Sequence, residues 1–239
     1  MILVFQHSES GPLGTIRELL NLHALRLREV RIHRNDPVPD DLDDVEAIIS
    51  LGGPQSANDA NPALEREMRL LKTAHASDLP ILGICLGSQL LAKALGGEVA
   101  RMPAPEIGWH GVALSPVGRE DPLFFGIGWT SAQFHWHADH VAKLPAGART
   151  LASSKACPVQ AWGAGLRTYG LQYHPEVDEA TIRRWLREDA NQLAPAGTTS
   201  DAVLSATVAN LADMQRLTER LVGNWVGYVV SRGVAGSRR

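Results

Sequence analysis

Residues 79–97 read LPILGICLGSQLLAKALGG, and this stretch decides the fold. Its first six residues form an apolar run typical of a buried strand, and from Ser88 onward the apolar residues recur at helical spacing. Between the two stands Cys85, with Gly83 and Gly87 on either side. A strand that passes directly into a helix is typical of a parallel sheet with helices packed on its faces.

The same alternation of strand and helix runs outward from this stretch. The middle of the chain, from residue 98 to 174, instead holds short strand-like segments separated by Gly and Pro, which predicts a mixed or antiparallel extension of the sheet. The fold class is therefore α/β, a three-layer, flavodoxin-like mixed and mostly parallel sheet with helices on both faces. The expected strands of the first half span 1–6, 28–33, 45–53 and 79–84, and the expected helices span 11–25, 61–76, 88–97 and 178–193.

The C-terminal part of the chain differs from the rest. Residues 194–200, APAGTTS, have the composition of a linker. We therefore expect a main domain over 1–193 and a helical extension over 201–239. The extension is amphipathic, so its apolar face covers either the main domain or a second copy of the chain, in a homodimer formed through the C-terminal helices.

The composition excludes several classes of protein. The chain has 239 residues, is 44% hydrophobic and carries a net charge of −3 with both signs interspersed, which argues against a nucleic-acid partner. It has no apolar run of about 18 residues and no basic segment before its first apolar run, so we expect no membrane span, no signal peptide and a cytoplasmic location. Its two cysteines make neither a disulfide framework nor a Cys-x-x-Cys zinc pair.

The segment Gly83-Ile84-Cys85-Leu86-Gly87 has the pattern Gly-x-nucleophile-x-Gly. With serine in the middle, this pattern makes the nucleophile elbow of α/β hydrolases. A thiol at the start of a helix is favoured as thiolate, and the Leu86 N–H would face a carbonyl under attack as an oxyanion donor. The alternative interpretation is an inert buried cysteine at a turn.

A cysteine nucleophile needs a base, and His174 is the best candidate. It ends the strand-like segment TYGLQYH, and Pro175 then takes the chain out of the sheet. The carboxyl ends of parallel strands meet at one edge of a sheet, so Cys85 and His174 can share a site there. Glu176 follows two residues later and is placed to hold the imidazole.

A third motif, Leu51-Gly52-Gly53-Pro54, also follows a predicted strand. A Gly-Gly-Pro turn exposes backbone N–H groups, and Gly53 could supply a second oxyanion donor. An ordinary loop has the same composition, so both interpretations stay open at this point.

Taken together and in this order, SLGGPQS, ILGICLGSQLLAKALGG and GLQYHPE resemble the class I glutamine amidotransferases. The resemblance covers residues 1–190 and is strongest to the amidotransferase domain of GMP synthase and its stand-alone relatives. It implies that Cys85 is the nucleophile, His174 the base and Glu176 the third catalytic residue, with Gly53 and Leu86 forming the oxyanion hole.

The resemblance also implies a set of substrate-binding residues. The segment FHWHADHV, 134–141, is similar to the family's Ser-His-Gly-Asp segment, which holds the amino-acid end of glutamine. Here a tryptophan replaces a small polar residue and an alanine replaces glycine, which implies altered substrate recognition. The implied substrate-binding residues are Gly52, Gln89, Trp136, His137, Ala138 and Asp139.

Three functions follow from these residues. The first is hydrolysis of the glutamine γ-amide through a Cys85 thioester, with the acceptor or synthetase supplied in trans, because the chain carries no phosphate-binding loop of a synthetase half. The second is hydrolysis of γ-glutamyl peptides or similar small molecules, and the third is a non-catalytic binding module of the same fold. None of the three needs an organic cofactor or a metal ion.

Overall fold

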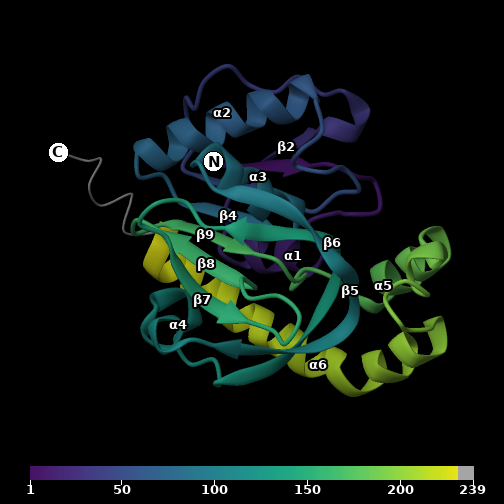
Figure 1. The fold of residues 1–239 in the computed structure, drawn as a ribbon. Coiled ribbons are helices and arrows are strands. Elements are labelled where there is room, and N and C mark those ends of the chain that lie inside the picture. The colour runs from purple at the N-terminus through teal and green to yellow at the C-terminus, as the bar shows by residue number, and fades with distance from the viewer. Residues whose placement is uncertain (231–239) are drawn as a thin grey trace.

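The computed structural model describes residues 1–230 and contains one mixed sheet of nine strands in the order β2-β1-β3-β4-β9-β8-β7-β5-β6 (Figure 1). Its first half is parallel and its second half is antiparallel. The parallel strands are β1 (Ile2–Gln6), β2 (Leu27–Arg31), β3 (Ala47–Ser50), β4 (Ile81–Ile84) and β9 (Thr168–Leu171). The antiparallel partners are β5 (Glu98–Leu114), β6 (Thr130–Lys143), β7 (Arg149–Ser153) and β8 (Ala161–Ala164).

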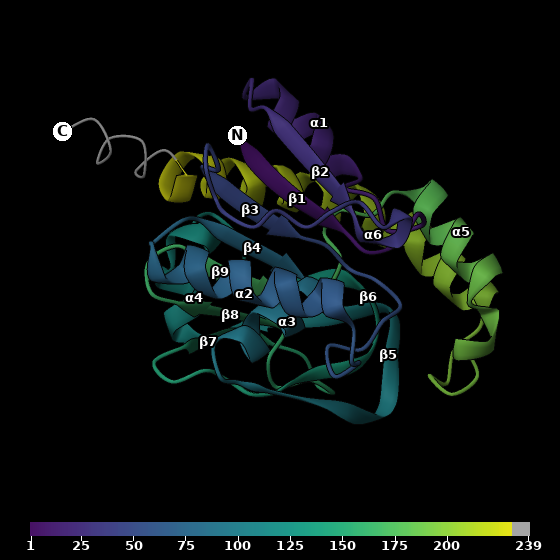
Figure 2. The same cartoon turned by 90° about the horizontal axis from the view of Figure 1, so that it is seen from above.

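Helices cover both faces of the sheet, as the sequence predicted (Figure 2). Side chains alternate along β1, so that Ile2 and Val4 enter one core while Leu3 and Phe5 enter the other. Helix α1 (Thr15–Leu22) packs over the first core, and helices α2 (Pro62–Ala76) and α3 (Leu86–Ala94) pack over the second. The α/β class and its three layers are therefore confirmed.

Local sequence explains where the longer helices begin. Asn61 caps α2 by accepting hydrogen bonds from two backbone amides, and Pro62 occupies the first helical position, where no N–H is needed. Asp178 caps α5 (Glu179–Glu188) in the same way through the Thr181 amide. The short elements are α4 (Pro116–Glu120), η1 (Ile32–Arg34), η2 (Pro122–Phe124) and η3 (Ala190–Gln192).

The middle of the chain differs in detail from the predicted short strands. The segments EVARM (98–102) and HGVAL (110–114) belong to one long strand, β5, which pairs with β6 and is interrupted by a register shift between Arg101 and Glu106. The segment TYGL forms β9, which is inserted between β4 and β8 and pairs in parallel with β4 and antiparallel with β8, so the sheet is mixed at this point. This insertion brings the carboxyl ends of β4 and β9 next to each other.

The predicted helical extension is one long helix, α6 (Ser200–Asn224), followed by a π-helical turn, η4 (Trp225–Val230). Its apolar side chains pack into the chain's own cores: Val203 joins one cluster, and Leu221 and Trp225 join the cluster beneath α1. Val208, by contrast, is exposed. The helix thus covers the main domain, and the rest of the predicted extension, 231–239, lies outside the described residues.

Across residues 1–230, no helix combines the length and the hydropathy that a membrane span requires.

Candidate active site

Cys85 lies at a sharp turn between β4 and α3. Its φ of 50° and ψ of −108° are strained for a residue with a side chain, and it occupies the position just before the helix. The neighbouring glycines make this turn possible: a Cβ on Gly83 would lie 2.7 Å from the Gly87 carbonyl oxygen, and one on Gly87 would lie 2.0 Å from the Ser50 carbonyl oxygen. The geometry of the predicted elbow is therefore present.

His174 follows β9 and is buried. Its Nδ1 lies 2.7 Å from Glu176 Oε1, and the ring of Trp185 from α5 meets its ring edge to face at 4.8 Å between centroids. The Thr15 amide and hydroxyl both donate to the Glu176 carbonyl oxygen, which fixes this turn against α1. The Nδ1 nitrogen of the imidazole is therefore held by the Glu176 carboxylate, while Nε2 has no hydrogen-bond partner in the described residues and is available to a reactant.

The charges around His174 favour its protonated form. Burial alone would lower the pKa of the imidazole, but the Glu176 carboxylate and then the Cys85 thiol, through charge and hydrogen bonding, raise this pKa to about 10. Within the described residues, His174 Nε2 has no hydrogen bond of normal geometry. The Cys85 thiol itself lies 3.9 Å from the Trp136 carbonyl oxygen. This arrangement suits an imidazolium beside the Cys85 sulfur.

The turn at Gly52 and Gly53 closes over these two side chains. A Cβ on Gly52 would lie 2.9 Å from His174 Cε1 and 3.5 Å from Cys85 Cβ, so only glycine fits without displacement. In the part of the chain that the structure describes, no acceptor takes a hydrogen bond from the Gly53 or Leu86 amide. Both amides are thus available to a ligand.

A buried polar network lies directly beneath this turn. Glu67 from α2 accepts from the Ser50 hydroxyl at 2.6 Å and lies 2.7 Å from His7 Nε2. Gln55 Nε2 in turn donates to the His7 carbonyl oxygen at 3.0 Å. Since Ser50 ends β3 and His7 follows β1, the network ties the ends of two strands to α2 and holds the turn between them.

The segment 136–139 forms the opposite wall. Gln89 Nε2 donates to the Asp139 carbonyl oxygen at 2.9 Å, and the Asp139 carboxylate accepts from Ser56 Oγ at 2.8 Å and pairs with Arg101 at 3.4 Å. The His137 ring turns inward, with Nε2 at 3.1 Å from Glu106 Oε2. Gln89 and His137 thus make hydrogen bonds within the protein, and the Trp136 carbonyl oxygen lies next to the Cys85 thiol.

One cavity of about 600 Å³ joins these parts. Every site residue expected from the sequence lines this cavity. The lining residues are Cys85, His174, Glu176, Gly53, Leu86, Gly52, Gln89, Trp136, His137, Ala138 and Asp139. Further lining residues come from α5 and the segment after it, and no motif in the sequence pointed to them: Trp185, Glu188, Asp189, Asn191, Gln192 and Pro195.

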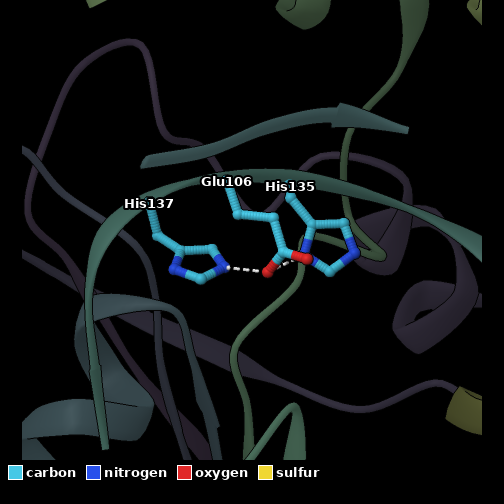
Figure 3. A group of neighbouring side chains, drawn as sticks. All are labelled: Glu106, His135 and His137. Carbon is cyan, nitrogen blue, oxygen red and sulfur yellow. Dashed lines mark hydrogen bonds and ion pairs between the residues drawn. The ribbon is translucent and has the colours of Figure 1, made fainter. Parts of the chain in front are cut away.

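Two buried residues near this cavity were also missed, Glu106 and His135. With His137 they form a compact group (Figure 3). The available signal was the spacing of two histidines in the segment FHWH, because residues two apart on a strand point to the same face.

Comparison with known proteins shows which family the chain resembles. The family model described as "Glutamine amidotransferase class-I" matches residues 15–190. The glutamine amidotransferase-like protein YfeJ of Salmonella typhimurium is 31% identical over 171 residues, covering 70% of this chain and 71% of that protein. A subunit of the glutamine-hydrolysing GMP synthase of Methanothermobacter thermautotrophicus is 39% identical over 135 residues, 56% of this chain and 67% of that relative.

A solved structure extends the likeness to the whole fold. The glutamine amidotransferase of Methylobacillus flagellatus superposes with a TM-score of 0.87 at 29% identity, over 94% of this chain and 93% of that one. Longer GMP synthases are matched over only a quarter to a third of their length. The family match covers most of the chain, and this protein therefore belongs to the class I glutamine amidotransferase family.

Proposed function

We propose that this protein hydrolyses the γ-amide of glutamine through a covalent Cys85 intermediate. The observation that carries the proposal is the buried His174–Glu176 pair, which faces a cysteine in elbow geometry across one cavity. A binding module would need neither the strained backbone at Cys85 nor a carboxylate aligned behind the histidine. Cys85, His174 and Glu176 are the proposed catalytic residues.

The proposed reaction has two halves. The Cys85 thiolate attacks the γ-carbonyl carbon, and the His174 imidazolium gives its proton to the departing ammonia as the C–N bond breaks. This leaves a γ-glutamyl thioester and a neutral His174. The neutral imidazole then takes a proton from water as the water attacks the thioester. The C–S bond breaks, glutamate is released, and the Cys85 thiolate and the His174 imidazolium are restored. Glu176 holds the ring and stabilises its charge in both halves.

The charge that develops on the substrate oxygen also needs donors. The backbone amides of Gly53 and Leu86 are free of acceptors in the described residues, and both belong to turns that line the cavity beside Cys85. Loss of one such donor typically lowers kcat by about 10²–10³. We assign the oxyanion hole to these two amides.

The ammonia would then pass to an acceptor. One relative is named as a single subunit of GMP synthase, a name that implies a further chain in that enzyme, and the present chain matches longer synthases over a minor part of their length. By analogy, we propose that a synthetase or other acceptor protein acts in trans. We assign no identity to the acceptor.

A second function, hydrolysis of γ-glutamyl peptides, is favoured by the size of the cavity. At about 600 Å³ it lies well within the range of roughly 300–1,000 Å³ that holds drug-sized ligands, and exceeds the needs of one amino acid. The cavity lining also includes Glu188, Asp189 and Gln192, which lie outside the set of residues expected to bind glutamine. Here the leaving group would be an amine larger than ammonia.

Glutamate release distinguishes the two. Wild type and Cys85→Ala would each be offered glutamine and a set of γ-glutamyl dipeptides in separate reactions. Release from glutamine that depends on Cys85 supports the first function, and release from the dipeptides alone supports the second. Equal release by both proteins from every substrate would refute the proposed site.

A further inference from the structure

A second group of polar side chains lies beside the cavity, with only His137 of the three lining it, and makes or breaks no bond in the proposed reaction. His135 and His137 lie two residues apart on β6 and so project to one face, and Glu106 on β5 is the direct cross-strand partner of His137. The three side chains converge from these two strands (Figure 3). All three are buried.

We propose that Glu106, His135 and His137 bind a divalent transition-metal ion. Their ligand atoms lie within 4.8 Å of one another, with Glu106 Oε2 at 3.1 Å from His137 Nε2 and at 3.5 Å from His135 Nδ1. Ligands about 2.1 Å from a tetrahedral Zn²⁺ are separated by about 3.4 Å. The two separations that involve Glu106 are therefore close to those of ligands around one ion, and the two histidines lie within 4.8 Å of each other.

Hydrogen bonds around the group orient the ligands as an outer shell would. His137 Nδ1 lies 3.1 Å from the Asp139 carbonyl oxygen, which orients the ring so that Nε2 faces Glu106; an ion bound here would replace the Nε2 proton. The Glu106 carboxylate accepts from Ser154 Oγ and from Gln160 Nε2, each at 2.6 Å. Both of these ligands are thus held in place before any ion arrives.

His135 supplies an independent observation. Its side chain is fully buried, yet within residues 1–230 neither ring nitrogen has a hydrogen-bond partner; Nδ1 has only the 3.5 Å approach to Glu106. Burial of a polar group without a partner is unfavourable. Coordination through Nδ1 would satisfy this ring, and two imidazoles with one carboxylate are a ligand set typical of Zn²⁺.

The surroundings of the group are consistent with an ion held between β5 and β6. Glu106 also lines a hollow of about 560 Å³ together with Trp109, His110 and Lys155, which brings the group close to the outside of the protein. An ion at this point would fix β5 to β6 immediately behind Trp136, whose carbonyl oxygen contacts the Cys85 thiol. The ion is structural in this proposal, and no step of the reaction passes through it.

The test is metal binding by the full chain. Protein stripped with a chelator would be titrated with Co²⁺, whose visible absorption reports tetrahedral coordination, and the bound Zn²⁺ would be counted by elemental analysis. We expect one equivalent per chain and a rise in Tm on loading, because the ion binds the folded state. His135→Phe keeps a ring and breaks no hydrogen bond, and we expect it to weaken Co²⁺ affinity at least about 10-fold.

Two controls separate this site from others. His75→Gln removes a partly buried imidazole of α2 that bonds to Thr168, and Cys85→Ala removes the nucleophile thiol; both should bind the ion as wild type does. Absence of a Co²⁺ spectrum in wild type, or equal affinity in His135→Phe, would overturn the proposal. Either result would leave Glu106 and His137 as a hydrogen-bonded ion pair.

Discussion

His174 Nδ1 and Glu176 Oε1 lie 2.7 Å apart, although only Pro175 separates the two residues in the chain. The strand β9 has already ended at Leu171, and the turn through Pro175 brings the carboxylate back to the imidazole. A short stretch of sequence thus supplies both the base and the group that orients it. The pair is covered by Trp185, so its charges are poorly screened by water.

The first prediction concerns the pH dependence of this pair. Because the pKa of His174 is raised from 6.5 to about 10, the folded state binds this proton more tightly than the unfolded chain does. Its contribution to stability is therefore complete below about pH 6.5 and is lost as the pH rises through about 10. Glu176→Gln removes the main cause of the rise, so the excess Tm of wild type over this variant should shrink between about pH 6 and 10.

Glu176→Gln should also change catalysis and its pH dependence. Glu176→Gln should lower kcat by about 10²-fold or more and move the alkaline limb of the pH–rate profile to lower pH. Glu179→Gln makes the same change three residues later on an exposed side chain paired with Arg183, and serves as the control. An unchanged alkaline limb in Glu176→Gln would show that Glu176 does not govern the protonation of His174.

The second prediction compares the two cysteines. Burial raises the pKa of the Cys157 thiol to about 11, and its side chain is fully enclosed, where it donates to the Val159 carbonyl oxygen. Cys85 lines the cavity beside His174. At neutral pH, iodoacetamide should therefore alkylate Cys85 at least about 10-fold faster than Cys157, as measured by peptide mass spectrometry.

A further variant links that reactivity to His174. His174→Ala removes the imidazolium next to the thiol and should slow alkylation of Cys85 while leaving Cys157 unaffected. Equal rates for the two cysteines in wild type would mean that Cys85 is not an activated thiol.

The main parts of the site follow from strand ends that the sequence reveals. Cys85, His174 and Gly53 each come directly after an apolar run, and parallel strands bring their carboxyl ends to one edge. The structure places all three at one cavity, and β9 lies directly beside β4, a position in the sheet that the sequence did not predict. The order of the strands in the sheet was not needed to predict that these residues meet, because parallel strands all end at the same edge.

The walls of the site could not be predicted in this way. Trp185 belongs to an amphipathic helix whose apolar residues look alike in sequence, and only the packing of α5 brings its ring to His174. Glu106 meets His137 because a register shift in β5 sets the pairing with β6. Similarly, periodicity showed that α6 has an apolar face but not which surface that face would cover.

The third prediction tests the buried network under the Gly52–Gly53 turn. Glu67→Ala leaves the buried His7 ring and Ser50 hydroxyl without their shared partner, and should lower the free energy of unfolding by about 3–5 kcal/mol. Glu65→Ala changes an exposed glutamate on the same helix and should stay within about 0.5 kcal/mol. Urea unfolding of both variants measures the difference. Equal values would mean that Glu67 is not important for holding the strand ends.

The fourth prediction uses a single methyl group to displace the base. The backbone of Gly52 is not in the left-handed region, so alanine is permitted there, but its Cβ would lie 2.9 Å from His174 Cε1. The crowding should cost about 1–3 kcal/mol of stability, and the shifted imidazole should lower kcat/KM by about 10²-fold. The control is Gly111→Ala in β5, where the added methyl group meets no atom within 4 Å and activity should be retained. If Gly52→Ala were as active as Gly111→Ala, the position of His174 would not limit the reaction.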